Sequence, residues 1–81
     1  MRQALYFTAP WCGPCQKLGP LMDELAQQFT IKKVNVDYDP ELPAKYNIRS
    51  IPTVVFFEND QEVERVVGAQ SREYYLQKFN Q

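Results

Sequence analysis

The chain has 81 residues, of which 44% are hydrophobic and 23% are charged, a balance typical of a soluble globular protein. A chain of this length supports one small core, so we expect residues 1–81 to form a single domain. Nine Lys and Arg against ten Asp and Glu give a net charge of −1, which lacks the basic excess of a nucleic-acid binder. No apolar run approaches the roughly 20 residues that cross a membrane, and no secretory segment opens the chain. We therefore expect a cytoplasmic protein that binds neither nucleic acid nor membrane.

The first half of the chain predicts a strand, a helix and a second strand. Residues 4–8 (ALYFT) are aromatic-rich and have the length of a short buried strand. After Cys12 the apolar residues recur at helical spacing, and Pro20 within this pattern predicts a kink. Residues 31–36 predict the next strand, which the strand-helix-strand order makes parallel to the first. The apolar face of the helix consists of Leu18, Leu21, Met22, Leu25, Ala26 and Phe29.

The second half predicts a short helix and a hairpin. Residues 37–49 are typical of a loop with a short helix, which Asp39 would cap. Residues 53–57 (TVVFF) form a continuous apolar run that suits a central strand, and Asn59-Asp60 follows as a turn. Residues 63–67 then return as the antiparallel partner. This half adds a hairpin to the parallel unit.

A last helix is predicted after Ser71. The Ser71 hydroxyl suits an N-cap, and Glu73 in the first turn complements the helix dipole. Tyr75, Leu76 and Phe79 would pack this helix onto the sheet. The predicted order is β-α-β-α-β-β-α, an α/β fold.

The only two cysteines, Cys12 and Cys15, lie where the first strand leads into the first helix. A structural disulfide is disfavoured, because closing a loop with two intervening residues stabilises a fold little. A structural zinc site needs four ligands, and the chain has two thiols and no histidine, so it would need a second chain. Reaction is the leading interpretation, and it requires neither a metal nor a cofactor.

Three separate motifs resemble those of the thioredoxin family. Residues 11–15 (WCGPC) match its active-site motif, residues 51–53 (IPT) are similar to its cis-proline segment, and residues 67–69 (VGA) are similar to its third substrate-facing turn. The resemblance covers nearly the whole chain but lacks the family's usual first strand and helix. It implies a minimal thioredoxin fold with a four-stranded mixed sheet, the residue 31–36 strand at one edge and the residue 63–67 strand at the other.

The resemblance also implies the roles of the site residues. A thiolate is the nucleophile in disulfide exchange, and a helix N-terminus stabilises its charge. Cys12 would attack a partner disulfide, and Cys15 would resolve the mixed disulfide to give a Cys12–Cys15 disulfide. Gly13 and Pro14 complete the active-site loop. Substrate contacts are expected from Trp11, Ile51, Pro52, Gly68 and Ala69.

One residue departs from the family pattern. Thioredoxins usually carry a buried aspartate six residues before the first cysteine, and this chain has Tyr6 there. Lys33 matches the lysine that accompanies the aspartate, although a solvated lysine on an edge strand would look the same. Tyrosine, with a reference pKa near 10, is a poor base, so water would take the Cys15 proton in a proton-transfer environment formed by Tyr6 and Lys33. We expect Tyr6 to face the helix that carries Cys15.

The sequence is compatible with three functions. The first is a monomeric protein-disulfide reductase that a flavoprotein reductase recharges, with roles in electron transport and cell redox homeostasis. The second is a glutaredoxin-like protein that glutathione recharges and that donates electrons to a dedicated enzyme such as ribonucleotide reductase. The third is a non-redox docking subunit. The Gly-Pro pair between the cysteines favours the first.

Overall fold

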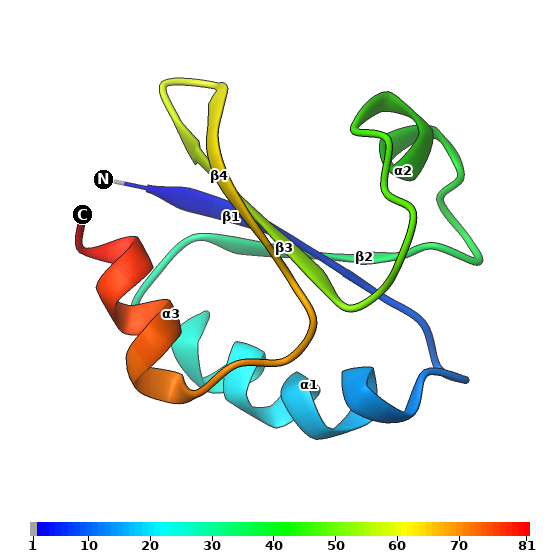
Figure 1. The fold of residues 1–81 in the computed structure, drawn as a ribbon, viewed down its shortest axis with the longest axis horizontal. Coiled ribbons are helices and arrows are strands. Elements are labelled where there is room, and N and C mark those ends of the chain that lie inside the picture. Colours follow the sequence, from blue (N-terminus) through cyan, green and yellow to red (C-terminus); the bar gives the residue numbers. More distant parts are fainter. Residues whose placement is uncertain (1) are drawn as a thin grey trace.

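A central sheet organises the chain, and the computed structural model describes residues 2–81 of it (Figure 1). The strand order is β2-β1-β3-β4, with β1 parallel to β2 and antiparallel to β3, and β3 antiparallel to β4. This confirms the predicted element order, the mixed sheet and both edge strands. The elements are β1 (Gln3–Thr8), α1 (Gly13–Leu25), β2 (Ile31–Asn35), α2 (Glu41–Lys45), β3 (Thr53–Glu58), β4 (Gln61–Val67) and α3 (Arg72–Phe79).

Side chains alternate along β1 and β3, so each central strand contributes to both faces of the sheet. Helices α1 and α3 cover one face and α2 covers the other (Figure 1). The larger core, beneath α1 and α3, is built on Tyr6 and Phe56 together with Leu25 and Phe79. The smaller core, beneath α2, is formed by Phe7, Val34 and Val55. Side chains of the central strands are therefore packed in a core on each face of the sheet.

Helix α1 ends earlier than its apolar pattern predicted. It stops at Leu25, and Phe29 lies beyond it in a tightened turn where the Gln28 N–H donates to the Leu25 carbonyl at 3.0 Å. Phe29 is partly buried and nevertheless packs against the core, because its ring stacks on Phe79 with centroids 4.4 Å apart. The helix continues through Pro20 without a break, and a kink there stays a prediction.

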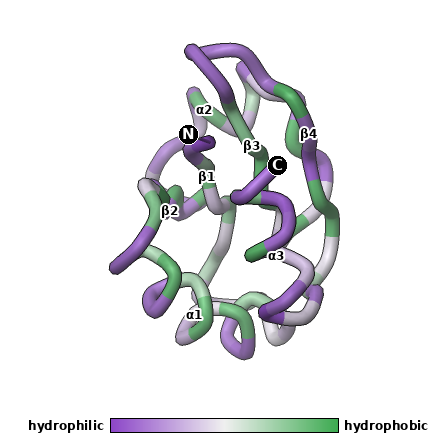
Figure 2. The backbone as a smooth tube through the Cα atoms, turned by 90° about the vertical axis from the view of Figure 1, so that its left-hand side faces the viewer, coloured by the Kyte–Doolittle hydropathy of each residue, from purple (hydrophilic) through white to green (hydrophobic). Residues whose placement is uncertain are grey.

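The hairpin begins its return strand earlier than predicted. Strand β4 starts at Gln61, and the turn before it places Asn59 and Asp60 at φ 52° and 68°. Both residues tolerate this left-handed conformation better than most others do. The register shifts between Phe56 and Phe57, which leaves Val63 as an extra residue in the returning strand. Figure 2 shows that this turn is hydrophilic.

The two helices predicted after β2 are confirmed with one adjustment. The carboxylate of Asp39 accepts hydrogen bonds from the N–H groups of Glu41 and Leu42, so it caps α2 although Pro40 is the residue at the N-cap position. The Ser71 hydroxyl accepts from the N–H of Tyr74 and caps α3 as predicted. Side-chain oxygens therefore satisfy orphan donors at both helix starts.

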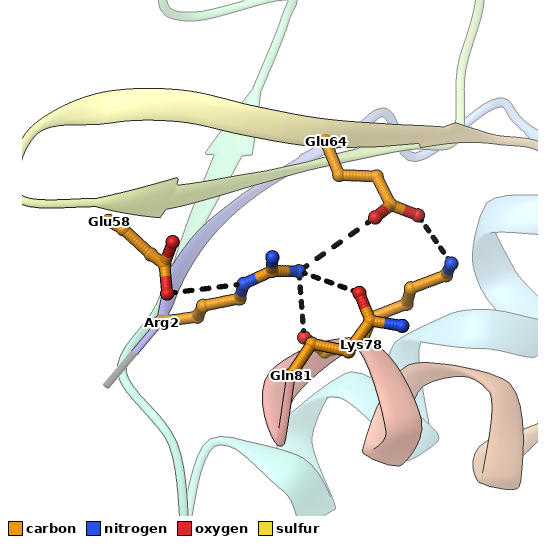
Figure 3. A network of polar contacts seen from close by, with 5 residues as sticks. All are labelled: Arg2, Glu58, Glu64, Lys78 and Gln81. Atoms are coloured by element: carbon orange, nitrogen blue, oxygen red, sulfur yellow. Dashed lines mark hydrogen bonds and ion pairs between the residues drawn. The ribbon is translucent and has the colours of Figure 1, made fainter.

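Polar contacts tie the N-terminal end of the chain to its C-terminal helix (Figure 3). The Arg2 guanidinium donates to the Lys78 carbonyl at 3.1 Å and to Gln81 at 3.4 Å, and it lies 3.6 Å from Glu58. Glu64 of β4 pairs with the Lys78 ammonium at 2.6 Å and lies 3.8 Å from Arg2. These contacts hold β1, β4 and α3 together at the end of the sheet away from the cysteines.

Candidate active site

The two cysteines lie at the start of α1, directly after the carboxyl end of β1. Cys12 is the N-cap residue, with φ −89° and ψ 112°, and its Sγ accepts a hydrogen bond from the Cys15 N–H at 3.3 Å. The structure contains the Cys12–Cys15 disulfide. Gly13, Pro14 and Gln16 complete the first turn without a negative charge. The backbone N–H and the helix dipole would therefore stabilise a Cys12 thiolate.

The two cysteines are both buried, Cys15 slightly more than Cys12. Cys12 is 6% exposed and Cys15 is 1% exposed, and both pack with Ala9 beneath Val36 and Ile51. The Cys12 Sγ lies 3.8 Å from the Ile51 carbonyl oxygen, at the side of the site formed by the segment before β3.

The three predicted segments meet around Cys12. The Ile51–Pro52 peptide bond is cis, as the resemblance implied. The Pro52 carbonyl accepts a hydrogen bond of 2.8 Å from the N–H of Gly68, whose φ of +89° lies in the left-handed region that favours glycine. Ala69 lines a surface hollow of about 350 Å³ together with Gly13, Pro14 and Lys17 of the first segment.

Trp11 forms an exposed wall of the site. Its side chain is 69% exposed, and its indole Nε1–H donates to the Asp37 carboxylate at 3.0 Å. Sequence reasoning missed Asp37, although a signal for it exists. Asp37 follows β2 closely, and the carboxyl ends of adjacent parallel strands lie at the same edge of a sheet. The ring borders a hollow of about 340 Å³ that is also lined by Val36, Pro43, Ile48, Arg49, Ser50 and Ile51.

Tyr6 lies beneath the cysteines, as predicted. It is buried, and its hydroxyl donates to the Cys15 carbonyl at 3.0 Å. Lys33 is the register partner of Tyr6 on β2, and its half-exposed side chain forms an ion pair of 3.0 Å with Asp23. Tyr6, Lys33 and Cys15 all line a further hollow of about 230 Å³. The phenol thus occupies the position beneath Cys15, and the lysine reaches the same hollow from the edge of the sheet.

Residues 2–81 show neither a metal-binding cluster nor a membrane-spanning helix. Within that range no three His, Cys, Asp or Glu side chains are grouped closely enough to hold a metal ion. The same residues contain no helix that is long and apolar enough to cross a membrane.

A cysteine pair that caps a helix, faces a cis-proline segment and lies at the carboxyl end of a central strand defines a redoxin of the thioredoxin fold. The comparisons with known proteins agree. The family model described as Thioredoxin matches residues 2–81. A solved structure of a mutant thioredoxin from Halobacterium salinarum superposes with a TM-score of 0.89 at 37% identity, covering 95% of this chain and 70% of that one. The chain therefore belongs to the thioredoxin family.

The curated relatives are thioredoxins from bacteria and plants. Thioredoxin 1 of Nostoc sp. is 51% identical over 67 residues, which cover 78% of this chain and 63% of the relative. The M-type chloroplastic thioredoxin of Spinacia oleracea is 49% identical over 78% of this chain and 37% of its own length. A thioredoxin of Rickettsia felis is 38% identical over 91% of this chain and 74% of its own length. The chain thus spans less than two thirds of the length of the first two relatives.

Proposed function

We propose that this chain is a thiol-disulfide oxidoreductase that reduces protein disulfides, with Cys12 as the nucleophile and Cys15 as the resolving thiol. The observation that carries the proposal is the position of the Cys12 sulfur, which accepts a hydrogen bond from the Cys15 N–H at the start of α1. Cys12 is also the less buried residue of the two. Membership of the thioredoxin family supports the same activity. The Cys12–Cys15 disulfide favours this activity over the non-redox docking function.

The reaction proceeds in two exchange steps. The Cys12 thiolate attacks one sulfur of the partner disulfide, which forms the mixed disulfide and releases the other partner sulfur as a thiolate. Cys15 then loses its proton and attacks the Cys12 Sγ, which breaks the mixed disulfide and releases the second partner sulfur. Two electrons pass to the partner, and the chain is left with the Cys12–Cys15 disulfide. The second step is intramolecular, so it benefits from a high effective concentration.

Water is the proposed acceptor for the Cys15 proton. The Tyr6 hydroxyl is already the donor of a hydrogen bond to the Cys15 carbonyl, and a phenol is a poor base at neutral pH. The hollow of about 230 Å³ beside Cys15 is wide enough for water and is bordered by the polar side chains of Lys33 and Asn35. The Lys33 ammonium lies at the edge of this hollow, where it forms its ion pair with Asp23.

The substrate is proposed to be an extended polypeptide segment that carries the disulfide. The Ile51 backbone beside Cys12 offers main-chain pairing of the β-augmentation kind. Trp11 supplies an exposed aromatic surface, which the Asp37 carboxylate holds in place. Pro52, Gly68 and Ala69 would complete the contact surface.

The proposed electron source is a flavoprotein reductase, and the chain is proposed to act as a monomeric single domain in the cytoplasm. The Gly-Pro pair between the cysteines supports the reductase over glutathione. Some relatives are named chloroplastic, so the compartment is tested separately, by fractionation of the source cells.

Insulin reduction tests the activity and its electron source together. Parent protein and Cys12→Ser would each be assayed with a flavoprotein thioredoxin reductase and with glutathione as the electron source. We expect turnover by the parent with the reductase and none by Cys12→Ser. Turnover with glutathione and none with the reductase would contradict the proposed electron source. Equal turnover by parent and variant would contradict the proposed activity.

A further inference from the structure

The hydroxyl of Tyr75 is bonded to the backbone of the turn between β4 and α3. Tyr75 is 0% exposed and belongs to the larger core. Its hydroxyl accepts a hydrogen bond from the Gln70 N–H at 3.1 Å and donates one to the Gly68 carbonyl at 3.3 Å. A buried hydroxyl without partners would destabilise the fold. Here both of its partners are main-chain groups of one turn.

Gly68 is held from two sides. Its carbonyl accepts from Tyr75, and its N–H donates to the Pro52 carbonyl at 2.8 Å. Pro52 follows Ile51, whose carbonyl oxygen lies 3.8 Å from the Cys12 Sγ. A continuous series of contacts therefore runs from the Tyr75 hydroxyl through Gly68 and the Ile51–Pro52 segment to the reactive sulfur.

We propose that Tyr75 is a positioning residue that holds the Gly68 turn against Pro52, so that a polypeptide disulfide meets a preformed surface. The inference rests on the proposed function and assigns the Tyr75 hydroxyl a part in substrate choice. A small disulfide needs access only to Cys12, whereas a polypeptide segment also lies against the Gly68 turn. Pre-organisation of that turn lowers the ordering cost of binding for the polypeptide alone.

The protonation state of Tyr75 suits this role. Burial raises the pKa of the Tyr75 phenol, although the hydrogen bond from the Gln70 backbone acts in the opposite direction. The hydroxyl therefore keeps its proton through the neutral range and remains a donor to Gly68. No other side chain donates to the Gly68 carbonyl within residues 2–81.

Tyr75→Phe tests the inference, because it removes the hydroxyl and keeps the ring. Tyr74→Phe is the matched control, since Tyr74 is the neighbouring residue and its hydroxyl makes no hydrogen bond within residues 2–81. Steady-state kinetics would be measured with insulin and with hydroxyethyl disulfide. Loss of one net hydrogen bond changes an equilibrium constant by about a factor of five. We therefore expect Tyr75→Phe to raise the insulin KM about fivefold. Its kcat for insulin, its kcat/KM for hydroxyethyl disulfide and all the values for Tyr74→Phe should stay unchanged.

Amide hydrogen exchange supplies a second readout. Loss of the Tyr75 hydroxyl should speed exchange of the Gln70 amide, which donates to it in the parent. An unchanged insulin KM, an equal loss against both disulfides, or an unchanged Gln70 exchange rate would each overturn the inference alone. A parent protein that reduced neither disulfide would overturn the proposed function and this inference with it.

Discussion

Replacing Tyr6 by Phe removes one hydrogen bond between the larger core and the cysteine turn. Tyr6 is buried beneath α1, and its hydroxyl donates to the Cys15 carbonyl at 3.0 Å. The Phe variant keeps the ring in the core and leaves that carbonyl with the helix's own backbone as its partner. Removing such a bond costs about 1 kcal/mol, the lower end of the range for a buried acceptor, because the carbonyl stays partly satisfied.

For a domain of 60–100 residues, 1 kcal/mol lowers Tm by about 4–8 °C. Thermal unfolding of the oxidised proteins, followed by circular dichroism, measures this shift. Tyr38→Phe is the control, because Tyr38 is 85% exposed and removal of its hydroxyl should leave the stability of the fold unchanged. An unchanged Tm for Tyr6→Phe, or an equal fall for Tyr38→Phe, would refute the assignment of this hydrogen bond.

Two further predictions concern α3. Ser71→Ala removes the N-cap of α3 and should lower stability by about 1 kcal/mol, seen as a lower urea midpoint with an unchanged slope; an unchanged midpoint would contradict the cap. Because burial raises the pKa of Tyr75, its phenol should ionise at a higher pH than free tyrosine does in an ultraviolet titration. The pKa of the Tyr75 phenol is higher in the folded protein than in the unfolded chain, so its neutral form contributes to the stability of the fold. This contribution is fully present below the unfolded pKa and is lost as pH rises through the folded pKa. A Tyr75 phenol that ionised at the same pH as free tyrosine would contradict that shift.

Local sequence was sufficient for the order of the elements but not for all of their ends. The continuous apolar run of β3 and the capping hydroxyl of Ser71 are local signals, and both were confirmed. The end of α1 was misplaced because Phe29 keeps the helical period while serving a different contact. Its ring stacks on Phe79, fifty residues later in the chain, and no local periodicity reports such a partner.

In the site, too, some features follow from local sequence and others depend on contacts between distant residues. The motif around Cys12 and the placement of Tyr6 beneath Cys15 follow from residue spacing and strand alternation. The contact of Asp37 with Trp11 depends on how adjacent strands end, which the strand order allows one to deduce but spacing alone does not. The bonds of Tyr75 to the Gly68 turn depend on the docking angle of α3, which has no signal in the local sequence.

Trapping of the mixed disulfide tests most directly the claim that Cys12 attacks and Cys15 resolves. Cys15→Ser and Cys12→Ser would each be reduced, mixed with oxidised insulin and analysed without reductant by intact mass. We expect a stable adduct with Cys15→Ser and almost none with Cys12→Ser, because the proposed nucleophile is the sulfur that accepts the Cys15 N–H at the start of α1. Equal trapping by the two variants, or trapping by Cys12→Ser alone, would contradict it.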